Sequence, residues 1–167
     1  MRFDPDENTP GSPEGPWNHS FRLEQSVGHQ RGFLDLISPS FSKLGPRLKV
    51  VALIDPAIER AAAILQTKCN NFVRSAYENT RVCKTLDEFV STMTKEEYPR
   101  AVIIGSPPMF RGSTVSGRDI EIQLLKKFPG ISLFVEKPVA TGSFQELEDS
   151  FEVAKAISDS GSICSIG

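Results

Sequence analysis

Short apolar segments alternate with amphipathic stretches along most of the chain. Four of these segments consist largely of Val, Ile and Leu, so neither face of the strand would be polar enough to meet solvent. They are predicted to be central, buried strands, at residues 48–54, 101–104, 131–135 and 162–166. Buried strands separated by helical stretches are typical of a parallel sheet with crossover helices. The pattern therefore predicts an α/β fold built on a doubly wound, Rossmann-like parallel sheet.

The stretches between these strands carry helix signals. Residues 57–66 have high helix propensity and follow an Asp-Pro pair that suits a helix start. Residues 119–128 fit a strand or a helix by their apolar spacing, but a crossover between parallel neighbours favours a helix. A short helix is also expected after Thr85, because Glu88 three residues later completes a capping box.

The same device, Ser143 followed by Glu146, predicts a longer helix that ends near Gly161. Its apolar residues recur every three or four positions, which predicts one stripe buried against the sheet. The residues of this stripe are Phe144, Leu147, Phe151, Ala154 and Ile157.

Length and composition favour a single domain. The chain has 167 residues, of which 39% are hydrophobic and 24% charged, enough to bury one core. Residues 1–20 are rich in Pro, Gly and polar residues and lack the apolar segment of a secretory signal, so they are interpreted as a disordered leader. Residues 21–167 form the predicted domain.

Charge and cysteine content argue against several classes of protein. Nineteen Lys and Arg against 21 Asp and Glu give a net charge of -2, without the basic surface that nucleic-acid binding requires. The apolar runs are strand-sized, far shorter than the ~20 residues that span a bilayer, so no membrane partner is expected. The three Cys residues match neither a disulfide framework nor metal-binding spacing. We expect a cytoplasmic protein without a bound metal.

The first candidate site is the turn after a strand expected at residues 21–27. A dinucleotide-binding fold has the pattern GxGxxG here, which lets a pyrophosphate approach backbone N–H groups at a helix N-terminus. Counted back from Gly32, the other two glycine positions hold Val27 and His29. The residues of this turn expected to contact a cofactor are Gly28, Arg31 and Gly32. The alternative is a loop that no longer binds phosphate.

The second candidate is Asp55, the first polar residue after the strand at 48–54. A carboxylate at the tip of this strand can accept hydrogen bonds from both hydroxyls of an adenosine ribose, and it would repel a 2′-phosphate. This mildly favours NAD over NADP. The alternative is that Asp55 caps the following helix, a role that Asp fills well, and both roles can hold together.

Two further candidates follow buried strands, at the carboxyl edge of the predicted sheet. Ser106 and Pro107 would place small groups beside a cofactor crevice, although the Pro-Pro pair could simply end the strand. Glu136 and Lys137 follow the strand at 131–135. A lysine there, beside a carboxylate, can contact both a cofactor and a substrate hydroxyl and assist proton movement.

Taken together, residues 48–167 resemble the cofactor-binding half of the Gfo/Idh/MocA oxidoreductases. Several matching segments occur in the order that the family has, which is more specific than any one motif alone. These segments are Val50–Pro56 with Glu59-Arg60, Gly105–Pro108, Gly117–Asp119, Phe134–Ala140 and Ile163–Gly167.

The resemblance implies an NAD- or NADP-dependent enzyme that oxidises or reduces hydroxyl and carbonyl groups of sugars, cyclitols or related small molecules. Lys137 would be the catalytic residue between nicotinamide and substrate, with Glu136 beside it. Asp55 would bind the adenosine ribose, and Ser106 and Pro107 would lie near the nicotinamide.

Three features depart from the pattern of the family. The glycine-rich turn is incomplete, Arg111 stands where the family commonly has a histidine, and the C-terminal substrate domain is absent from the chain. That domain carries the usual acid–base histidine and the sheet used for dimerisation.

Three interpretations remain open. The chain is an NAD(P)-dependent oxidoreductase that is complete in another form or with a partner, a non-catalytic dinucleotide-binding regulator or decayed paralogue, or a shortened gene product. A cofactor domain without its second domain would expose apolar surface, which predicts self-association.

Overall fold

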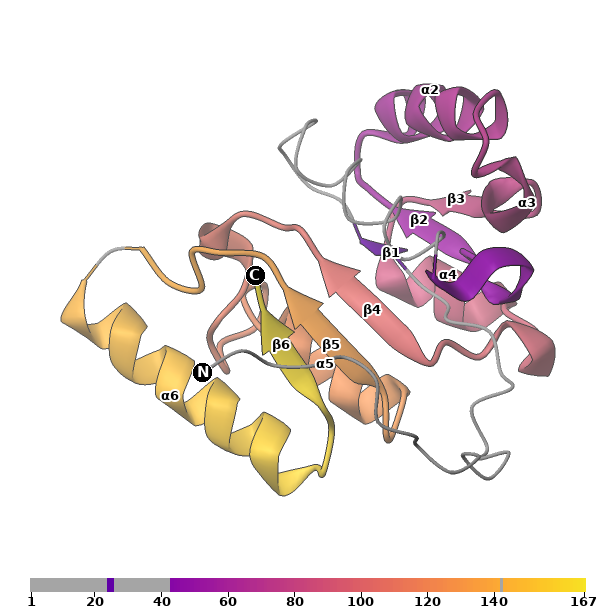
Figure 1. Cartoon of the computed structure of the whole chain (residues 1–167). Coiled ribbons are helices and arrows are strands. Elements are labelled where there is room, and N and C mark those ends of the chain that lie inside the picture. The colour runs from indigo at the N-terminus through magenta and orange to yellow at the C-terminus, as the bar shows by residue number, and fades with distance from the viewer. Residues whose placement is uncertain (1–23, 26–42, 142) are drawn as a thin grey trace, which may run out of the picture.

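The computed structural model describes residues 24–25, 43–141 and 143–167, which form a parallel sheet with helices packed on it (Figure 1). Within these residues the sheet has six strands in the order β3-β2-β1-β4-β5-β6, and every neighbouring pair is parallel. The order reverses between β1 and β4, as in a doubly wound Rossmann fold, which confirms the predicted fold class. The strands are β1 (Glu24–Gln25), β2 (Ala52–Ile54), β3 (Arg81–Cys83), β4 (Ala101–Ile104), β5 (Ser132–Val135) and β6 (Cys164–Ile166).

Strands β2, β4 and β5 lie within three of the four predicted apolar segments, although β2 is shorter than expected. The fourth segment also contains a strand, β6, but its predicted central and buried position was wrong. Strand β6 pairs with β5 at one edge of the described sheet and exposes Ser165 and Ile166. Strand β3, at the opposite edge, was not predicted, because three residues beginning with Arg81 carry little apolar signal.

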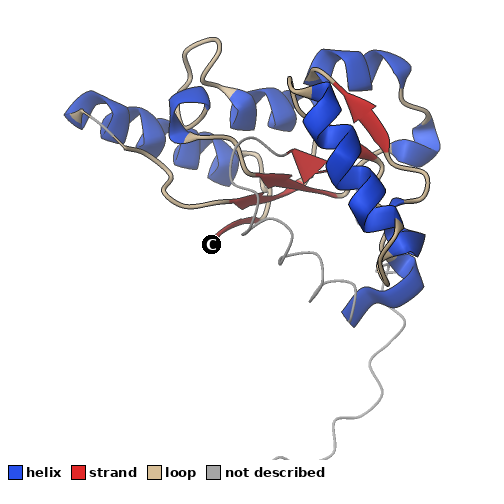
Figure 2. Cartoon of the chain, turned by 90° about the horizontal axis from the view of Figure 1, so that it is seen from above, coloured by secondary structure: helices blue, strands red, loops and turns tan. Residues whose placement is uncertain are grey.

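The predicted helices are all present, and Figure 2 shows the helices flanking the strands. Both expected N-caps form: the Thr85 hydroxyl accepts from the Glu88 N–H at 3.1 Å, and the Ser143 hydroxyl accepts from the Glu146 N–H at 3.4 Å. The reciprocal half of each capping box does not form, because Glu88 accepts from the Lys84 N–H and Glu146 pairs with Arg118. The helices are α2 (Ile58–Cys69), α3 (Arg74–Tyr77), α4 (Leu86–Thr92), α5 (Ile120–Lys127) and α6 (Phe144–Asp159), with 3-10 turns η1 (Gly45–Arg47), η2 (Lys95–Glu97) and η3 (Pro108–Phe110).

The largest core lies between one face of the sheet and helices α4, α5 and α6. Ile54 and Ile104 point to this face, where Phe89 of α4 and Leu124 of α5 are also buried. Successive side chains of a strand point to opposite faces, so Leu53 lies on the other face, against α2. Burial of apolar strands on both faces fixes the carboxyl ends of β2 and β4 at one rigid rim.

The predicted apolar stripe of α6 is not buried. Phe144 and Phe151 are 76% and 67% exposed, Leu147 and Ala154 are also exposed, and of the five residues only Ile157 reaches the core. The first half of α6 extends past the strands at one end of the molecule (Figures 1 and 2), where no sheet surface can cover it.

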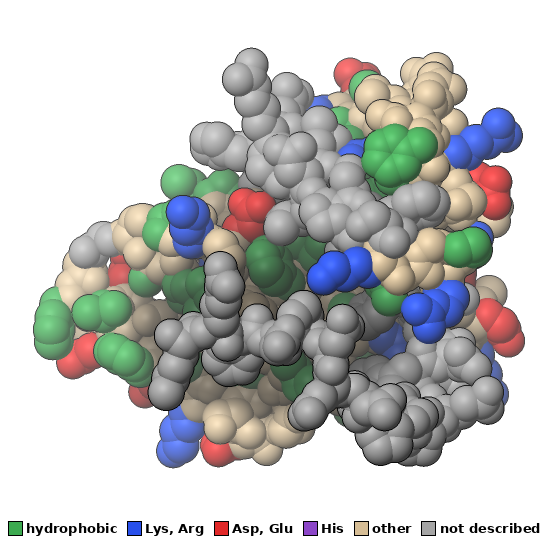
Figure 3. All heavy atoms as spheres, in the orientation of Figure 1, with side chains coloured by type: hydrophobic (Ala, Val, Ile, Leu, Met, Phe, Trp, Pro, Cys, Tyr) green, Lys and Arg blue, Asp and Glu red, His purple; other side chains and the backbone are tan. Residues whose placement is uncertain are grey.

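The opposite side of α6 is polar in this first half and faces the protein. Glu146 forms an ion pair with Arg118 at 3.3 Å, and Asp149 accepts a hydrogen bond from the Ser113 hydroxyl at 3.0 Å. These contacts anchor the helix to the loop before α5. They turn the aromatic residues outward, and hydrophobic side chains gather at this end of the molecule in Figure 3.

Two sets of predictions lie outside the described residues. They are the disordered leader at residues 1–20 and the glycine-containing turn with Gly28, Arg31 and Gly32. In the part that the structure describes, no helix combines the length and apolar character needed to cross a bilayer.

Candidate functional site

The predicted site residues that the structure describes follow strands at the carboxyl edge of the sheet. Asp55 follows β2, Ser106 follows β4, and Lys137 follows β5. Because all of these strands are parallel, their carboxyl ends meet at one rim. The residues after β2 and β5 are separated by three strand intervals, roughly 14 Å at the usual spacing. The reversal point between β1 and β4 lies between them, which is where ligands bind in folds of this kind.

Asp55 is buried, and its carboxylate is already engaged. One oxygen accepts a hydrogen bond from the Ala57 N–H at 2.7 Å, and Nη2 of Arg60 lies 3.0 and 2.9 Å from the two oxygens. The N-cap of α2 is Ala57, so Asp55 organises the turn before the helix and is not itself the cap. Arg60 is partly exposed and places a positive charge beside the expected ribose position. The sequence prediction gave no role to this arginine.

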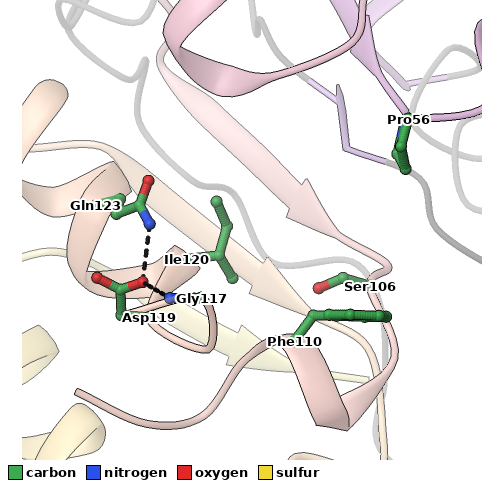
Figure 4. A pocket seen from close by; sticks show the side chains of 7 residues that line it. All are labelled: Pro56, Ser106, Phe110, Gly117, Asp119, Ile120 and Gln123. Carbon is green, nitrogen blue, oxygen red and sulfur yellow. Dashed lines mark hydrogen bonds between the residues drawn. The ribbon is translucent and has the colours of Figure 1, made fainter. Parts of the chain in front are cut away.

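A pocket of about 230 Å³ opens at the carboxyl edge of the sheet, between Pro56 after β2 and the start of α5 (Figure 4). It is smaller than sites that enclose a whole drug-sized ligand, and so it suits one part of an extended molecule. Its lining comes from the ends of β2 and β4, from η3, and from the start of α5. The lining residues are Pro56, Ser106, Phe110, Gly117, Asp119, Ile120 and Gln123.

The pocket combines an aromatic wall with polar groups. The Phe110 ring is about half exposed, and the Asp119 carboxylate accepts from the Gly117 N–H at 3.1 Å and from the Gln123 amide at 2.8 Å (Figure 4). The Ser106 hydroxyl is buried and has no hydrogen-bond partner in the described structure. Buried polar groups are normally paired, so this hydroxyl is suited to a ligand. Sequence reasoning identified Ser106 but missed Phe110 and the start of α5, whose positions depend on the loop between β4 and α5.

The turn after β5 presents Lys137 to solvent from a fixed backbone. The Glu136 N–H donates to the Ile104 carbonyl at 3.0 Å, and the Lys137 N–H donates to the Gly167 carbonyl at 2.8 Å. The Lys137 side chain is exposed, and its ammonium group makes no hydrogen bond or ion pair with the described residues. The group can therefore meet a ligand at the rim without first breaking an internal contact.

Arg111, which replaces the histidine common in the family, is buried under this turn. It is 2% exposed and donates to the carbonyls of Ser106, Glu136 and Pro138. Burial lowers the pKa of its guanidinium, while the negative charges of Glu121 and Glu136 oppose that shift. The sequence showed the exchange of residue type but not this placement, which depends on two loops meeting in space.

Glu121 is the buried carboxyl group beside this region. It accepts a hydrogen bond from the Gly112 N–H at 3.1 Å. Burial raises the pKa of its carboxyl, and the Gly112 hydrogen bond and the positive charge of Arg111 oppose the rise. No cluster of three or more metal-binding side chains occurs among residues 24–25, 43–141 and 143–167.

Comparison with known proteins identifies relatives of the chain. A family model described as an oxidoreductase family with an NAD-binding Rossmann fold, Gfo/Idh/MocA, matches residues 32–167. Two uncharacterized proteins of Schizosaccharomyces pombe are 35% and 38% identical to the chain over 159 residues, or 94% of its length. The chain spans only about a third of these relatives, 36% and 34% of their lengths.

Solved structures with a similar fold include dehydrogenases and a repressor. The WlbA dehydrogenase of Chromobacterium violaceum, in complex with NADH and UDP-GlcNAcA, gives a TM-score of 0.59 at 18% identity, covering 90% of this chain and 36% of that one. A myo-inositol dehydrogenase of Corynebacterium glutamicum gives 0.55 at 19% identity, covering 89% and 36%. A super-repressor mutant of Gal80p from Saccharomyces cerevisiae gives 0.58 at 21% identity, covering 87% and 34%.

At these low identities the structural likeness concerns the fold alone. The family model adds sequence evidence over residues 32–167, and its Rossmann fold agrees with the strand order. The chain therefore belongs to the Gfo/Idh/MocA oxidoreductase family and carries its NAD-binding Rossmann domain.

Proposed function

We propose that this chain is the cofactor-binding half of an NAD(P)-dependent oxidoreductase that acts on a hydroxyl or carbonyl group of a sugar-like or other small molecule. The observation that carries the proposal is a row of three features along one rim of the sheet. Asp55 lies on one side of the reversal point, the free Lys137 side chain lies on the other, and the pocket with the unpaired Ser106 hydroxyl lies between them. An extended dinucleotide requires such a row of contacts.

The residues present fit a dinucleotide in three parts. Gly28, Arg31 and Gly32 would contact the phosphates through the turn after β1. Asp55 would hold the ribose at the adenosine end, and the pocket lined by Ser106 and the Phe110 ring would receive the part of the molecule that leads toward the nicotinamide. The remaining contacts, toward the nicotinamide, would come from Ser106, Pro107, Glu136 and Lys137.

Lys137 is the residue we assign to proton transfer. The bound cofactor would supply hydride transfer, which the protein itself cannot perform. Lys137 would hydrogen-bond to the substrate oxygen, giving it a proton from the ammonium form when a carbonyl is reduced and taking the proton as the neutral amine when a hydroxyl is oxidised. The fixed backbone of its turn would orient this group, and Glu136 would supply negative charge beside it.

We also propose that NAD is preferred to NADP. The Asp55 carboxylate would lie where a 2′-phosphate would bind, and Arg60 balances its charge without leaving a free cationic site. The ribose hydroxyls would share the carboxylate with Arg60.

A binding titration tests the proposal most directly. Purified protein should change the fluorescence of NADH on binding, with weaker binding of NADPH. Absence of binding by both nucleotides at high concentration would contradict a cofactor role. Because the relatives are about three times longer than the chain, we expect turnover to require a substrate-binding surface beyond this half.

Turnover with a panel of polyols and sugars tests the catalytic assignment. In a form of the protein that shows turnover, Lys137→Ala should reduce the rate by about 10²-fold or more, the usual contribution of a general acid or base. Binding of NADH should change much less, because Lys137 is one of many contacts. Unchanged turnover would remove Lys137 from the mechanism.

A second candidate is a non-catalytic, dinucleotide-binding regulator. The likeness in fold to the Gal80p super-repressor supports this alternative. It predicts that the chain binds NADH but turns over no substrate. It also predicts that the nucleotide changes the binding of a protein partner. We further propose a cytoplasmic location, no nucleic-acid partner, and self-association through the exposed aromatic side of α6.

A further inference from the structure

The buried side chain of Arg111 joins two loops at the carboxyl rim. Its Nε donates to the Ser106 carbonyl after β4, and its Nη2 donates to the Glu136 and Pro138 carbonyls after β5. The two carbonyls after β5 lie on either side of Lys137 in the chain. A single side chain therefore holds the turn that carries Lys137 against the loop that carries Ser106.

These contacts are obligatory for the charge. Hydrogen bonds stabilise a buried guanidinium, and backbone carbonyls accept those from Nε and Nη2 of Arg111, while Nη1 is buried without a partner among the described residues. If either loop moved away, N–H groups of the guanidinium would lose their carbonyl acceptors in a place that water does not reach. The position of the two loops and the burial of the charge thus depend on each other.

Gly112 shows independently that the two loops are in close contact. Its φ is +75°, and a Cβ added there would lie 3.1 Å from the Val139 carbonyl oxygen. Its N–H donates to the buried carboxyl of Glu121 on α5. Two consecutive residues after η3 therefore lie against the backbone of residues 136–139. Arg111 contacts it through its side chain, and Gly112 approaches it closely because glycine has no side chain.

We propose that Arg111 is a positioning residue that sets the Lys137 side chain relative to Ser106 and so shapes the nicotinamide side of the site. This inference rests on the proposed cofactor role of the rim. The N–H groups of Glu136 and Lys137 are bound to Ile104 and Gly167 from the strand side. Arg111 binds the carbonyls of the same turn, and the backbone around Lys137 is held from both sides.

An arginine is suited to this role and a lysine is not. The guanidinium is planar and presents donors in different directions, so Nε and Nη2 reach carbonyls of separate loops at the same time. A lysine carries its three donors on one nitrogen and cannot reproduce the separate Nε and Nη2 positions. The variant Arg111→Lys keeps the charge and most of the apolar stem, and it should still fail to hold both loops together.

The test compares two ligands that differ in the nicotinamide half. Arg111→Met and Arg111→Lys should each weaken NADH binding by about tenfold, equivalent to ~1.4 kcal/mol. Binding of ADP-ribose, which lacks nicotinamide, should stay within about twofold. Arg111→Lys keeps the test open if Arg111→Met does not fold. The matched control is Arg81→Met, which removes an ion pair to Glu97 on another part of the sheet and should leave both affinities unchanged.

Equal losses for NADH and ADP-ribose, or no loss for either, would overturn the positioning role. Amide hydrogen exchange at Glu136 and Lys137 provides a readout that needs no ligand. It should accelerate in both Arg111 variants and not in Arg81→Met. If the wild-type protein binds neither ligand, the proposed cofactor role fails, while unchanged exchange at these amides separately overturns the link between the loops.

Discussion

At the scale of single residues, the contact between Asp55 and Arg60 governs the expected choice of cofactor. The Asp55 carboxylate is 1% exposed, whereas the arginine is partly open to solvent. The two charges balance each other. The Asp55 carboxylate repels a 2′-phosphate and also keeps Arg60 from binding one. Removing that charge would free Arg60 to bind the phosphate, because arginine pairs well with phosphate oxygens.

We predict that Asp55→Asn shifts the ratio of NADPH to NADH affinity toward NADPH by about tenfold, or ~1.4 kcal/mol. The Asn side-chain oxygen can still accept from the Ala57 N–H, so the turn before α2 should persist. Titrations with both nucleotides measure the ratio. Adding Arg60→Met to this variant should reverse the shift, and an unchanged ratio in Asp55→Asn would rule out a discriminating role for the pair.

Glu121 predicts a dependence of stability on pH. Burial raises the pKa of its carboxyl in the folded state above the ordinary value of 4.5. The folded protein therefore keeps this proton to higher pH than the unfolded chain does. The stability associated with the neutral carboxyl is complete below pH 4.5 and is lost as the pH rises through the raised folded-state pKa.

The variant Glu121→Gln stays neutral at every pH and should remove this loss. We expect its free energy of unfolding, measured with urea, to increase relative to wild type as the pH rises from below 4.5 toward neutrality. The trend is the test, because the amide also weakens the hydrogen bond from Gly112 by a constant amount. Glu148→Gln, on the exposed surface of α6, should show no such trend, and a flat difference for Glu121→Gln would contradict the prediction.

At the scale of secondary-structure elements, local signals were predictable and tertiary partners were not. Thr85 and Ser143 cap their helices as expected, because a cap depends on residues three apart in the chain. Periodicity likewise found the central strands. It could not show which side of α6 is buried, because Glu146 and Asp149 find their partners in a distant loop. The contacts of Arg111 were hidden for the same reason.

The reversed polarity of α6 predicts that its aromatic residues contribute little to folding. In the monomer, at protein concentrations too low for association, Phe151→Ala should change the free energy of unfolding by less than about 0.5 kcal/mol, as expected for a surface site. Phe89→Ala, on the buried side of α4, should lower the free energy of unfolding by about 3–5 kcal/mol. Denaturant unfolding of both variants measures the contrast. A large loss in Phe151→Ala would mean that the helix buries its aromatic side in solution.

At the scale of the whole molecule, the parallel sheet explains why residues far apart in sequence share one site. The sheet brings the ends of β2, β4 and β5 to one rim, and this arrangement follows from strand order and parallel direction alone. Strand β6 lies at the edge of the described sheet. It follows α6 after a short turn, and Ile163 and Ile166 there are 67% and 60% exposed. Exposed strand edges and apolar patches favour association between molecules.

We therefore predict that the chain self-associates through α6 and β6, and that charge on this surface opposes association. Phe151→Asp should move the mass measured by light scattering toward that of a monomer, because a carboxylate cannot be buried in an apolar contact without a partner. Phe72→Asp places the same charge on another exposed aromatic residue, between α2 and α3, and should leave the mass unchanged. A wild-type protein that stays monomeric at all concentrations would show that this surface does not bind a second copy.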